Sequence, residues 1–191
     1  MDRILRNDRF HVYDVLNPAM GTGIIMGTET AFSATKALLS HFNPANSQMY
    51  HVPEYLRLRV ADAGAATTSF EMALVMDIID RHTSGGSQIT PADRKVEKPR
   101  TSGAEIWFGA LTLAAANGAA KRSAQRVLKA TALADGDVFE LDFAALLSGV
   151  NLGRMVIAPG NNLVLHVWAP AQTTEPEFEV AWRWREVQKR S

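Results

Sequence analysis

Histidine is the residue type best suited to acid–base chemistry or metal binding at neutral pH, and this chain contains five of them. They are His11, His41, His51, His82 and His166. No two have the HxH or HxxxH spacing that sets two imidazoles side by side on one element, so no single strand or helix carries a metal motif. A metal site assembled across strands stays open. We interpret the histidines as surface or edge residues, with His166 packing across strands beside Trp168.

Carboxylates are the other acid–base candidates. A glycosidase uses two of them at a fixed separation, which the sequence does not define. We interpret as structural or solvated the candidates Asp77, Asp80, Asp135, Asp137, Glu140 and Asp142, with Asp135-Gly136-Asp137 forming a turn. The chain has no cysteine, and therefore no thiolate nucleophile, disulfide or cysteine-bound zinc. It also lacks the GxSxG motif, and the run from Gly21 to Gly27 does not have the GxGxxG spacing of a nucleotide loop.

These observations predict a binding or structural protein that is not an enzyme, with no catalytic, cofactor-binding or metal residues. Tryptophan is then the most informative side chain, because an exposed indole on a β-sandwich can stack on a sugar. Trp182 and Trp184 lie on the same strand face as Phe178 and Val180, and polar residues occupy most of the positions between them. This pattern predicts that the two tryptophans belong to the core. Exposure of the other two, Trp107 and Trp168, distinguishes a carbohydrate-binding protein from a structural one.

The elements that must position these side chains are strands, because alternation with a period of two dominates the sequence. It is seen in the segments 54–60, 70–78, 138–143 and 177–185, and the apolar runs 105–113 and 163–168 are interpreted as further strands. Short connections containing Gly, Pro or Asn separate them. Many such strands predict an all-β protein, an antiparallel β-sandwich of the jelly-roll kind.

Three segments are less regular. We predict that residues 30–42 are extended and end in a strand from Leu38 to Phe42. We predict one short helix near residues 119–129, exposing Lys121, Arg122 and Arg126. A polar segment as long as 84–102 is usually functional, disordered or docked on a neighbour. We interpret its basic residues as solvated and not as a phosphate-binding track: Arg94, Lys95, Lys98 and Arg100.

Composition sets the class of protein. The 191 residues include 20 Lys and Arg and 20 Asp and Glu, so the formal net charge is zero, which argues against nucleic acid as a partner. A hydrophobic content of 47% is sufficient for a folded core. No apolar run is long enough for a transmembrane helix, and the N-terminus lacks a signal peptide's apolar segment. We divide the chain into an N-terminal arm, residues 1–35, and a single β-sandwich domain, residues 36–191.

Four stretches resemble small β-sandwich virion proteins of tailed bacteriophages, among them capsid decoration (cement) proteins and jelly-roll modules of tails. The stretches are 42–47 (FNPANS), 81–91 (RHTSGGSQITP), 157–163 (IAPGNNL) and 169–187 (APAQTTEPEFEVAWRWREV). They are structural motifs, and the group has no active-site residues to transfer. The sequence departs from the group in the Ala-rich segment after Leu113 and in the charged loop around Arg94.

The resemblance implies a decoration protein that stabilises the capsid surface. Its partners would be the major capsid protein and copies of itself, as a homotrimer, with no nucleic acid or membrane. It would be made in the host cytoplasm and lie on the capsid exterior. The alternatives are a receptor- or carbohydrate-binding module of a tail or fibre, and an enzyme on a cupin-like barrel. Apolar residues on both faces of segments 70–79 and 105–113 independently predict self-association, and the arm is expected to serve assembly.

Overall fold

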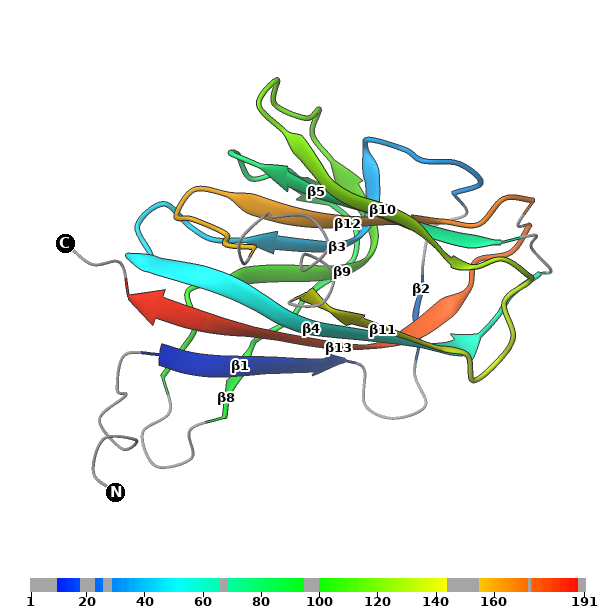
Figure 1. Ribbon diagram of the computed structural model, residues 1–191, viewed down its shortest axis with the longest axis horizontal. Helices are drawn as coiled ribbons and strands as arrows, with labels where there is room; N and C mark the ends of the chain where they lie inside the picture. Colours follow the sequence, from blue (N-terminus) through cyan, green and yellow to red (C-terminus); the bar gives the residue numbers. More distant parts are fainter. Residues whose placement is uncertain are drawn as a thin grey trace.

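Strands make up every element of the computed structural model, which describes residues 10–17, 23–25, 29–65, 69–94, 100–143, 155–171 and 173–188 (Figure 1). In chain order they are β1 Phe10–Asn17, β2 Ile24–Ile25, β3 Lys36–Phe42, β4 Met49–Asp62, β5 Phe70–Asp77, β6 His82–Ser84, β7 Ser87–Gln88, β8 Ala92–Asp93, β9 Glu105–Leu113, β10 Lys121–Lys129, β11 Val138–Asp142, β12 Asn162–Trp168 and β13 Glu177–Gln188. In this part of the chain no helix is long and apolar enough to cross a membrane.

The strands form two antiparallel sheets that pack face to face. Sheet A has the order β11-β4-β13-β1-β8, with β2 also paired to β13. Sheet B has the order β10-β5-β12-β3-β9-β6, with β7 also paired to β9. Figure 1 shows the two layers one above the other. The predicted all-β sandwich is therefore confirmed.

The pairing is nested, which identifies the topology as a jelly roll. β1 pairs with β13, β3 with β12, β4 with β11 and β5 with β10, so the first half of the chain pairs with the second half in reverse order. Successive pairs alternate between sheets A and B. Such a wound hairpin is the two-Greek-key arrangement of the jelly roll. Strands β6 to β9 are an insertion between β5 and β10 that extends both sheets on the side of β1 and β3.

The central strand β13 shows why the alternation in the sequence was informative. Its inward side chains are at most 1% exposed: Phe178, Val180, Trp182 and Trp184. Glu179 and Arg183 lie on the other face, half-buried, where they form ion pairs with Arg59 and Asp14. The strand pairs with β4 on one side and β1 on the other. The predicted register is confirmed, because a slip of one residue would have exchanged the two faces.

The helix predicted near residues 119–129 is wrong: Lys121–Lys129 is the strand β10. The segment follows a turn in which the Ala120 amide donates to the Asn117 carbonyl at 2.9 Å. Pairing with β5 supplies backbone hydrogen bonds, and Ala124 and Leu128 pack against the core. Helix propensity differences are a fraction of a kilocalorie per residue, so this tertiary pairing overrides them.

The N-terminal arm is also wrong for residues 10–17. Strand β1 pairs along its whole length with β13 and lies inside sheet A, with β8 on its other side. Tyr13 and Val15 are 1% and 2% exposed and belong to the main core. Gly23–Ile25 also approaches β13 through β2, while the rest of the Gly21–Gly27 run and residues 1–9 lie outside the described residues. The boundary at residue 36 therefore cuts through the sandwich.

The outer face of sheet B carries a second, smaller core formed by the chain itself. Its buried residues are Ala37, Leu111, Leu113 and Val164, with Trp107 packed against them. Residues 29–35 cross this face: the Ala169 amide donates to the Glu29 carbonyl and the Leu113 amide to the Thr35 carbonyl, both at 2.9 Å. The apolar outer side of segment 105–113 is thus covered within one chain, which removes part of the argument for a trimer.

Candidate functional site

The sandwich interior holds a chain of polar side chains from both sheets. His41 on β3, His51 on β4 and Glu186 on β13 are all at most 3% exposed. His41 Nε2 lies 2.8 Å from His51 Nδ1, and His51 Nε2 lies 3.5 Å from Glu186 Oε1. Trp182 Nε1 donates to His41 Nδ1 at 3.0 Å. The Ser102 hydroxyl donates to the same Glu186 oxygen.

The Trp182 indole determines which nitrogen donates in each hydrogen bond between these side chains. Trp182 Nε1 is only a donor, so His41 Nδ1 must accept and His41 Nε2 must carry the hydrogen. That hydrogen is donated to His51 Nδ1, which puts the single ring N–H of neutral His51 on Nε2, pointing towards the Glu186 carboxyl. Burial lowers the pKa of His51 to about 3 and that of His41 well below its usual value, and raises that of Glu186. Both imidazoles are therefore neutral at pH 7.

This arrangement joins the sheets, since β3 belongs to sheet B and β4 and β13 belong to sheet A. Three of the four imidazole nitrogens make hydrogen bonds within the chain and the fourth faces the carboxyl, so the two histidines do not converge on one point as metal ligands do. Among the described residues no cluster of His, Asp and Glu is arranged to hold a metal. The interpretation of the histidines as surface or edge residues is therefore wrong for His41 and His51, which are fully buried. The sequence does not reveal this pair, because β3 and β4 are brought together only by the sandwich.

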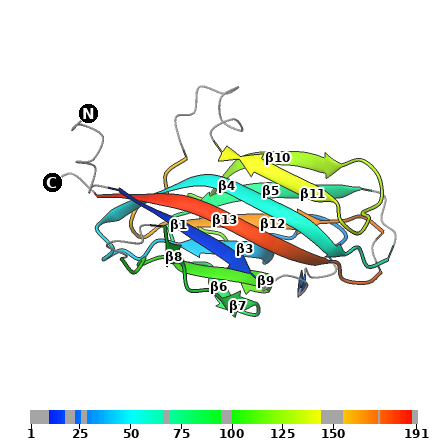
Figure 2. The same ribbon diagram turned by 90° about the horizontal axis from the view of Figure 1, so that it is seen from below.

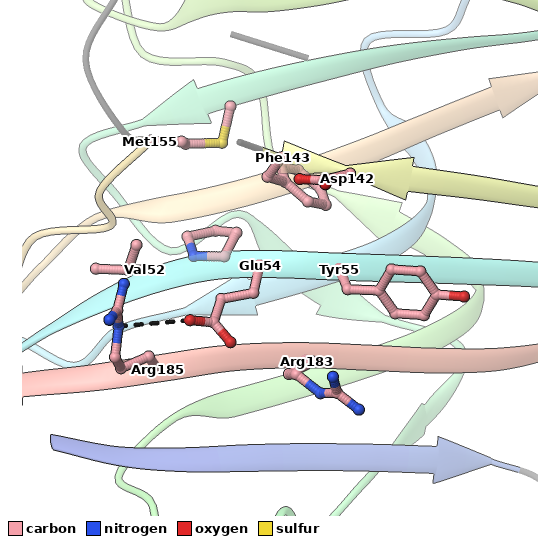
Figure 3. Close-up of a pocket in the computed structure, with 9 residues that line it drawn as sticks. Val52, Glu54, Tyr55, Asp142, Phe143, Met155, Arg183 and Arg185 are labelled. Carbon is pink, nitrogen blue, oxygen red and sulfur yellow. Dashed lines mark ion pairs between the residues drawn. The ribbon is translucent and has the colours of Figure 1, made fainter. Parts of the chain in front are cut away.

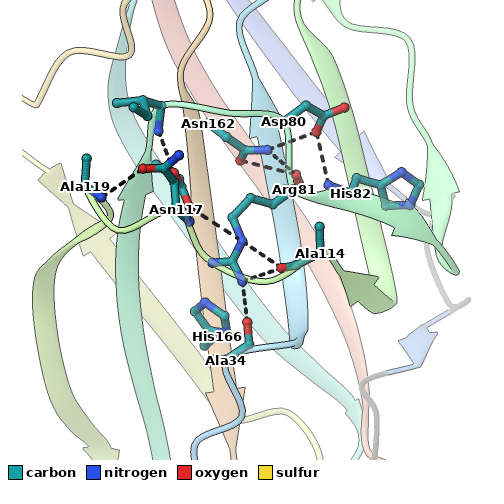
Figure 4. A network of polar contacts seen from close by, with 12 residues as sticks. Ala34, Asp80, Arg81, His82, Ala114, Asn117, Ala119, Asn162 and His166 are labelled. Atoms are coloured by element: carbon teal, nitrogen blue, oxygen red, sulfur yellow. Dashed lines mark hydrogen bonds and ion pairs between the residues drawn. The ribbon is translucent and has the colours of Figure 1, made fainter.

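A second polar network fastens the loops at one end of sheet B (Figure 4). Arg81, 1% exposed, donates to the Ala34 carbonyl at 2.5 Å and to the Ala114 carbonyl at 2.9 and 3.1 Å. Asp77 lies 3.7 Å from Arg81 and accepts from the Asn117 amide at 3.0 Å. These contacts tie residues 29–35 and the turn before β10 to the sheet, so their role is structural.

Among the described residues, a groove on the outer face of sheet A has room for a small ligand (Figure 3). Its cavity has a volume of about 520 Å³ and is lined by Val52, Pro53, Glu54, Tyr55, Asp142, Phe143, Met155, Arg183 and Arg185. Residues from β4 and β13 form its floor, and the end of β11 borders it. The sequence predicts no site here, because outward positions of strands carry charged residues whether or not they bind a ligand.

Internal contacts hold the polar groups of this groove. Arg185 Nε lies 3.5 Å from Glu54 Oε1, and Arg183 donates to Asp14 at 2.7 Å. The Tyr55 hydroxyl donates to Glu140 at 2.6 Å, and burial together with this bond raises the pKa of Tyr55. The lining contains two carboxylates and two guanidinium groups, so its formal charge is zero. The groove can therefore offer donors, acceptors and the Tyr55 ring to an uncharged polar ligand.

The two tryptophans outside the main core are covered. Trp168 is 5% exposed and meets the Phe32 ring edge-on at a centroid distance of 5.7 Å. Trp107 is half-buried and stacks on His82 at 4.0 Å. His166 packs beside Phe32 and is only 1% exposed. Its Nδ1 donates to the Lys36 carbonyl at 2.6 Å. It is therefore not available to a sugar. Its predicted role in packing across strands is confirmed.

The carboxylates singled out in the sequence are dispersed and have structural partners. Asp80 accepts from the His82 amide, Asp135 from the Ala63 amide, and Asp137 from Lys129. The predicted turn at Asp135-Gly136-Asp137 is confirmed, with Gly136 at a φ of +83°. Each of these three carboxylates is therefore held by its own structural partner.

The long segment 84–102 docks on the chain's own strands in its described part. β7 pairs with β9 and β8 with β1. Arg94 forms an ion pair with Asp14 at 3.1 Å, and the Arg100 amide donates to Asp93 at 2.8 Å. Asp93 also lies 2.7 Å from His11 Nδ1. Lys95 and Lys98 lie outside the described residues.

Comparisons with known proteins give little beyond this. No family model matches the chain. No curated protein matches it either. Among solved structures the chain is similar to the VP1 pentamer of human polyomavirus 6, with 8% identity over 97% of both chains and a TM-score of 0.25. This likeness is too low to support an argument, so the jelly-roll assignment rests on the strand order alone.

Proposed function

We propose that this chain is a structural protein of a virus particle, a decoration protein of a tailed bacteriophage that binds and stabilises the capsid surface. The observation that carries the proposal is the nested jelly-roll pairing around an interior filled by its own side chains. Capsid proteins, lectins and cupins share this architecture. The fold by itself does not choose among them, so the choice must come from the interior and the surface.

The interior favours a structural role over a cupin-like enzyme. In this chain the side chains that could bind a metal inside the sandwich, His41 and His51, bond to each other and to Trp182. They act as a link between the sheets. The surface favours the same role over stacking of sugars on tryptophan, because Trp107 and Trp168 are both covered by other aromatic rings.

The proposed partners are the major capsid protein and further copies of the chain, as the homotrimer that the sequence analysis expects. The protein would be made in the bacterial host cytoplasm and would lie on the capsid exterior, and no reaction is part of this role. The test is co-sedimentation of the purified protein with capsids that lack it. Saturable binding, with raised thermal stability of the capsids, is the expected result. Capsids that pellet without the protein at micromolar concentration contradict the proposal.

The groove on sheet A favours a second function, binding of a neutral oligosaccharide by a tail or fibre module. A hexose needs donors and acceptors for its hydroxyl groups and an apolar surface for one ring face. Glu54, Asp142 and the two arginines supply the former, and Tyr55 supplies the latter. NMR titration with neutral oligosaccharides should shift the resonances of this groove, and Tyr55→Ala should abolish the shifts. Arg59→Ala, on the same face outside the groove, is the matched control.

A further inference from the structure

Both sheets end in an exposed strand on the same side of the sandwich. β10 is the last strand of sheet B and β11 the last strand of sheet A, each with one partner among the described strands. Figure 2 shows both strands along the same side of the molecule, running in opposite directions, and Figure 1 shows that they belong to different layers. The opposite side is closed by short strands, β8 with two residues and β6 with three. We refer to the side formed by β10 and β11 as the β10–β11 side.

The two strands carry opposite charges. In β10, Lys121–Lys129, the charged residues are Lys121, Arg122, Arg126 and Lys129, with no acidic residue. In β11 and the turn before it they are Asp135, Asp137, Glu140 and Asp142, with no basic residue. The zero net charge of the chain thus conceals a basic strand and an acidic strand on the same side of the sandwich, one in each sheet. Like charges directly across two strands are destabilising, so β10 cannot pair well with another β10.

The same side also exposes apolar side chains. Val127 on β10 is 53% exposed and Val138 on β11 is 49% exposed. The described residues contain four large hydrophobic side chains of this exposure, and these two lie on the β10–β11 side. An edge strand that carries an exposed valine and several charges of one sign can pair with a strand of opposite charge.

We propose that a second copy of this chain docks on the β10–β11 side, with β10 of one copy along β11 of the next. A rotation axis parallel to the strands produces this contact. A rotation by 180° about this axis leaves the direction of each strand unchanged but exchanges the positions of sheets A and B. Basic β10 of one copy therefore meets acidic β11 of the next copy, and the two strands run in opposite directions. A rotation axis perpendicular to the strands would instead set β10 against β10, which the charges oppose. The contact gives a structural basis to the self-association that the proposed function includes. The inference rests on that self-association and not on capsid binding.

The geometry of one chain also sets the register of the contact. Rotation about an axis parallel to the strands leaves height along the axis unchanged. Lys129 contacts Asp137 within one chain, so the loop ends of β10 and β11 lie level. Counting back along β10 and forward along β11 from that pair brings Arg126 level with Glu140, and Val127 level with Phe139, one residue from Val138. A two-fold axis satisfies these pairings, because only a rotation by 180° brings sheet B of one copy into the layer of sheet A of the next.

Two experiments on the purified protein, without capsids, test the contact. The first reverses charges: Arg126→Glu and Glu140→Lys should each weaken self-association in analytical ultracentrifugation by at least about tenfold. An equal mixture of the two variants should restore it, because each then offers the opposite charge to the other. A variant that merely misfolds cannot be rescued in this way. Arg100→Glu, beside β8 on the opposite side, is the matched control.

The second experiment uses the absence of cysteine in the natural chain. Val127→Cys mixed with Val138→Cys should form a disulfide between chains under mild oxidation, and neither variant alone should do so. The proposal is overturned by a monomer at 100 µM, by an oligomer that ignores both charge reversals, or by cross-linking of Val127→Cys alone. Each of these results can occur while capsids still bind the protein, so failure of the contact is separable from failure of the proposed function.

Discussion

Mild acid should destabilise this protein because histidines are buried in the neutral form. Burial lowers the pKa of His51 to about 3 and that of His166 to about 4, from a usual value of 6.5. His51 faces His41 and Glu186, and beyond that carboxyl lie His11 and Asp93. His166 lies among the Lys36 carbonyl, Arg81 and Arg122, and the positive charges of the two arginines further oppose its protonation.

The sign and size follow from linkage. The unfolded chain takes up protons as the pH falls through about 6.5, while the folded chain does not until its lower pKa is reached, so stability is lost over that interval. At pH 5 the difference is about 1.5 pH units for each of these two histidines, or about 2 kcal/mol each, relative to pH 7. His41, whose pKa is also lowered by burial, adds to the loss. The raised pKa of Glu186 has the opposite sign and offsets part of it as that carboxyl takes up its proton.

The assay is urea denaturation at pH 7 and pH 5 at fixed ionic strength. The wild-type free energy of unfolding should fall by several kcal/mol, and His166→Gln should recover about 2 kcal/mol of that difference. His82→Gln removes a histidine outside the interior and is the matched control. A wild-type loss below about 1 kcal/mol would mean that the histidines are hydrated or charged in the folded protein, and the account of the interior would be wrong.

Three substitutions or truncations test the rest of the fold. Trp182→Ala should lower the free energy of unfolding by about 3 to 5 kcal/mol, because it leaves a cavity and removes the donor to His41; a loss under about 1 kcal/mol in urea denaturation would place this indole outside the core. Arg81→Met should cost about 2 to 3 kcal/mol and expose residues 29–35 to limited proteolysis, since the Ala34 and Ala114 carbonyls lose their donors. Unchanged proteolysis would show that the segment is held by other contacts. Deleting residues 1–17 should abolish cooperative thermal unfolding, because β1 lies inside sheet A; a normal melting transition would restore the arm hypothesis.

The strands were predictable where one face is buried and the other is wet. β13 is the clearest case, because Trp182 and Trp184 alternate with Arg183 and Arg185, and burial of one face requires that period. β4 was read from Leu56, Leu58 and Val60 for the same reason. Alternation identifies an element and its faces, but it contains no information on which strand becomes the neighbour.

The groove and the β10–β11 side could not be predicted from the sequence. Tyr55 and Arg183 are 128 positions apart, and only the pairing of β4 with β13 puts them across from one another. Lys121–Lys129 reads as a helix because its residues favour one, and it becomes a strand because β5 offers an edge for it to pair with.

The sequence by itself determined the class of fold, the inward face of the main strands and the absence of cysteine chemistry, since these depend on local period and on composition. Tertiary structure decided everything that depends on contacts between distant segments. It placed β1 in the sheet, buried His41 against His51, and set a basic strand beside an acidic one. The physical reason is that backbone pairing and burial act between strands far apart in the chain, and their energies outweigh local preference.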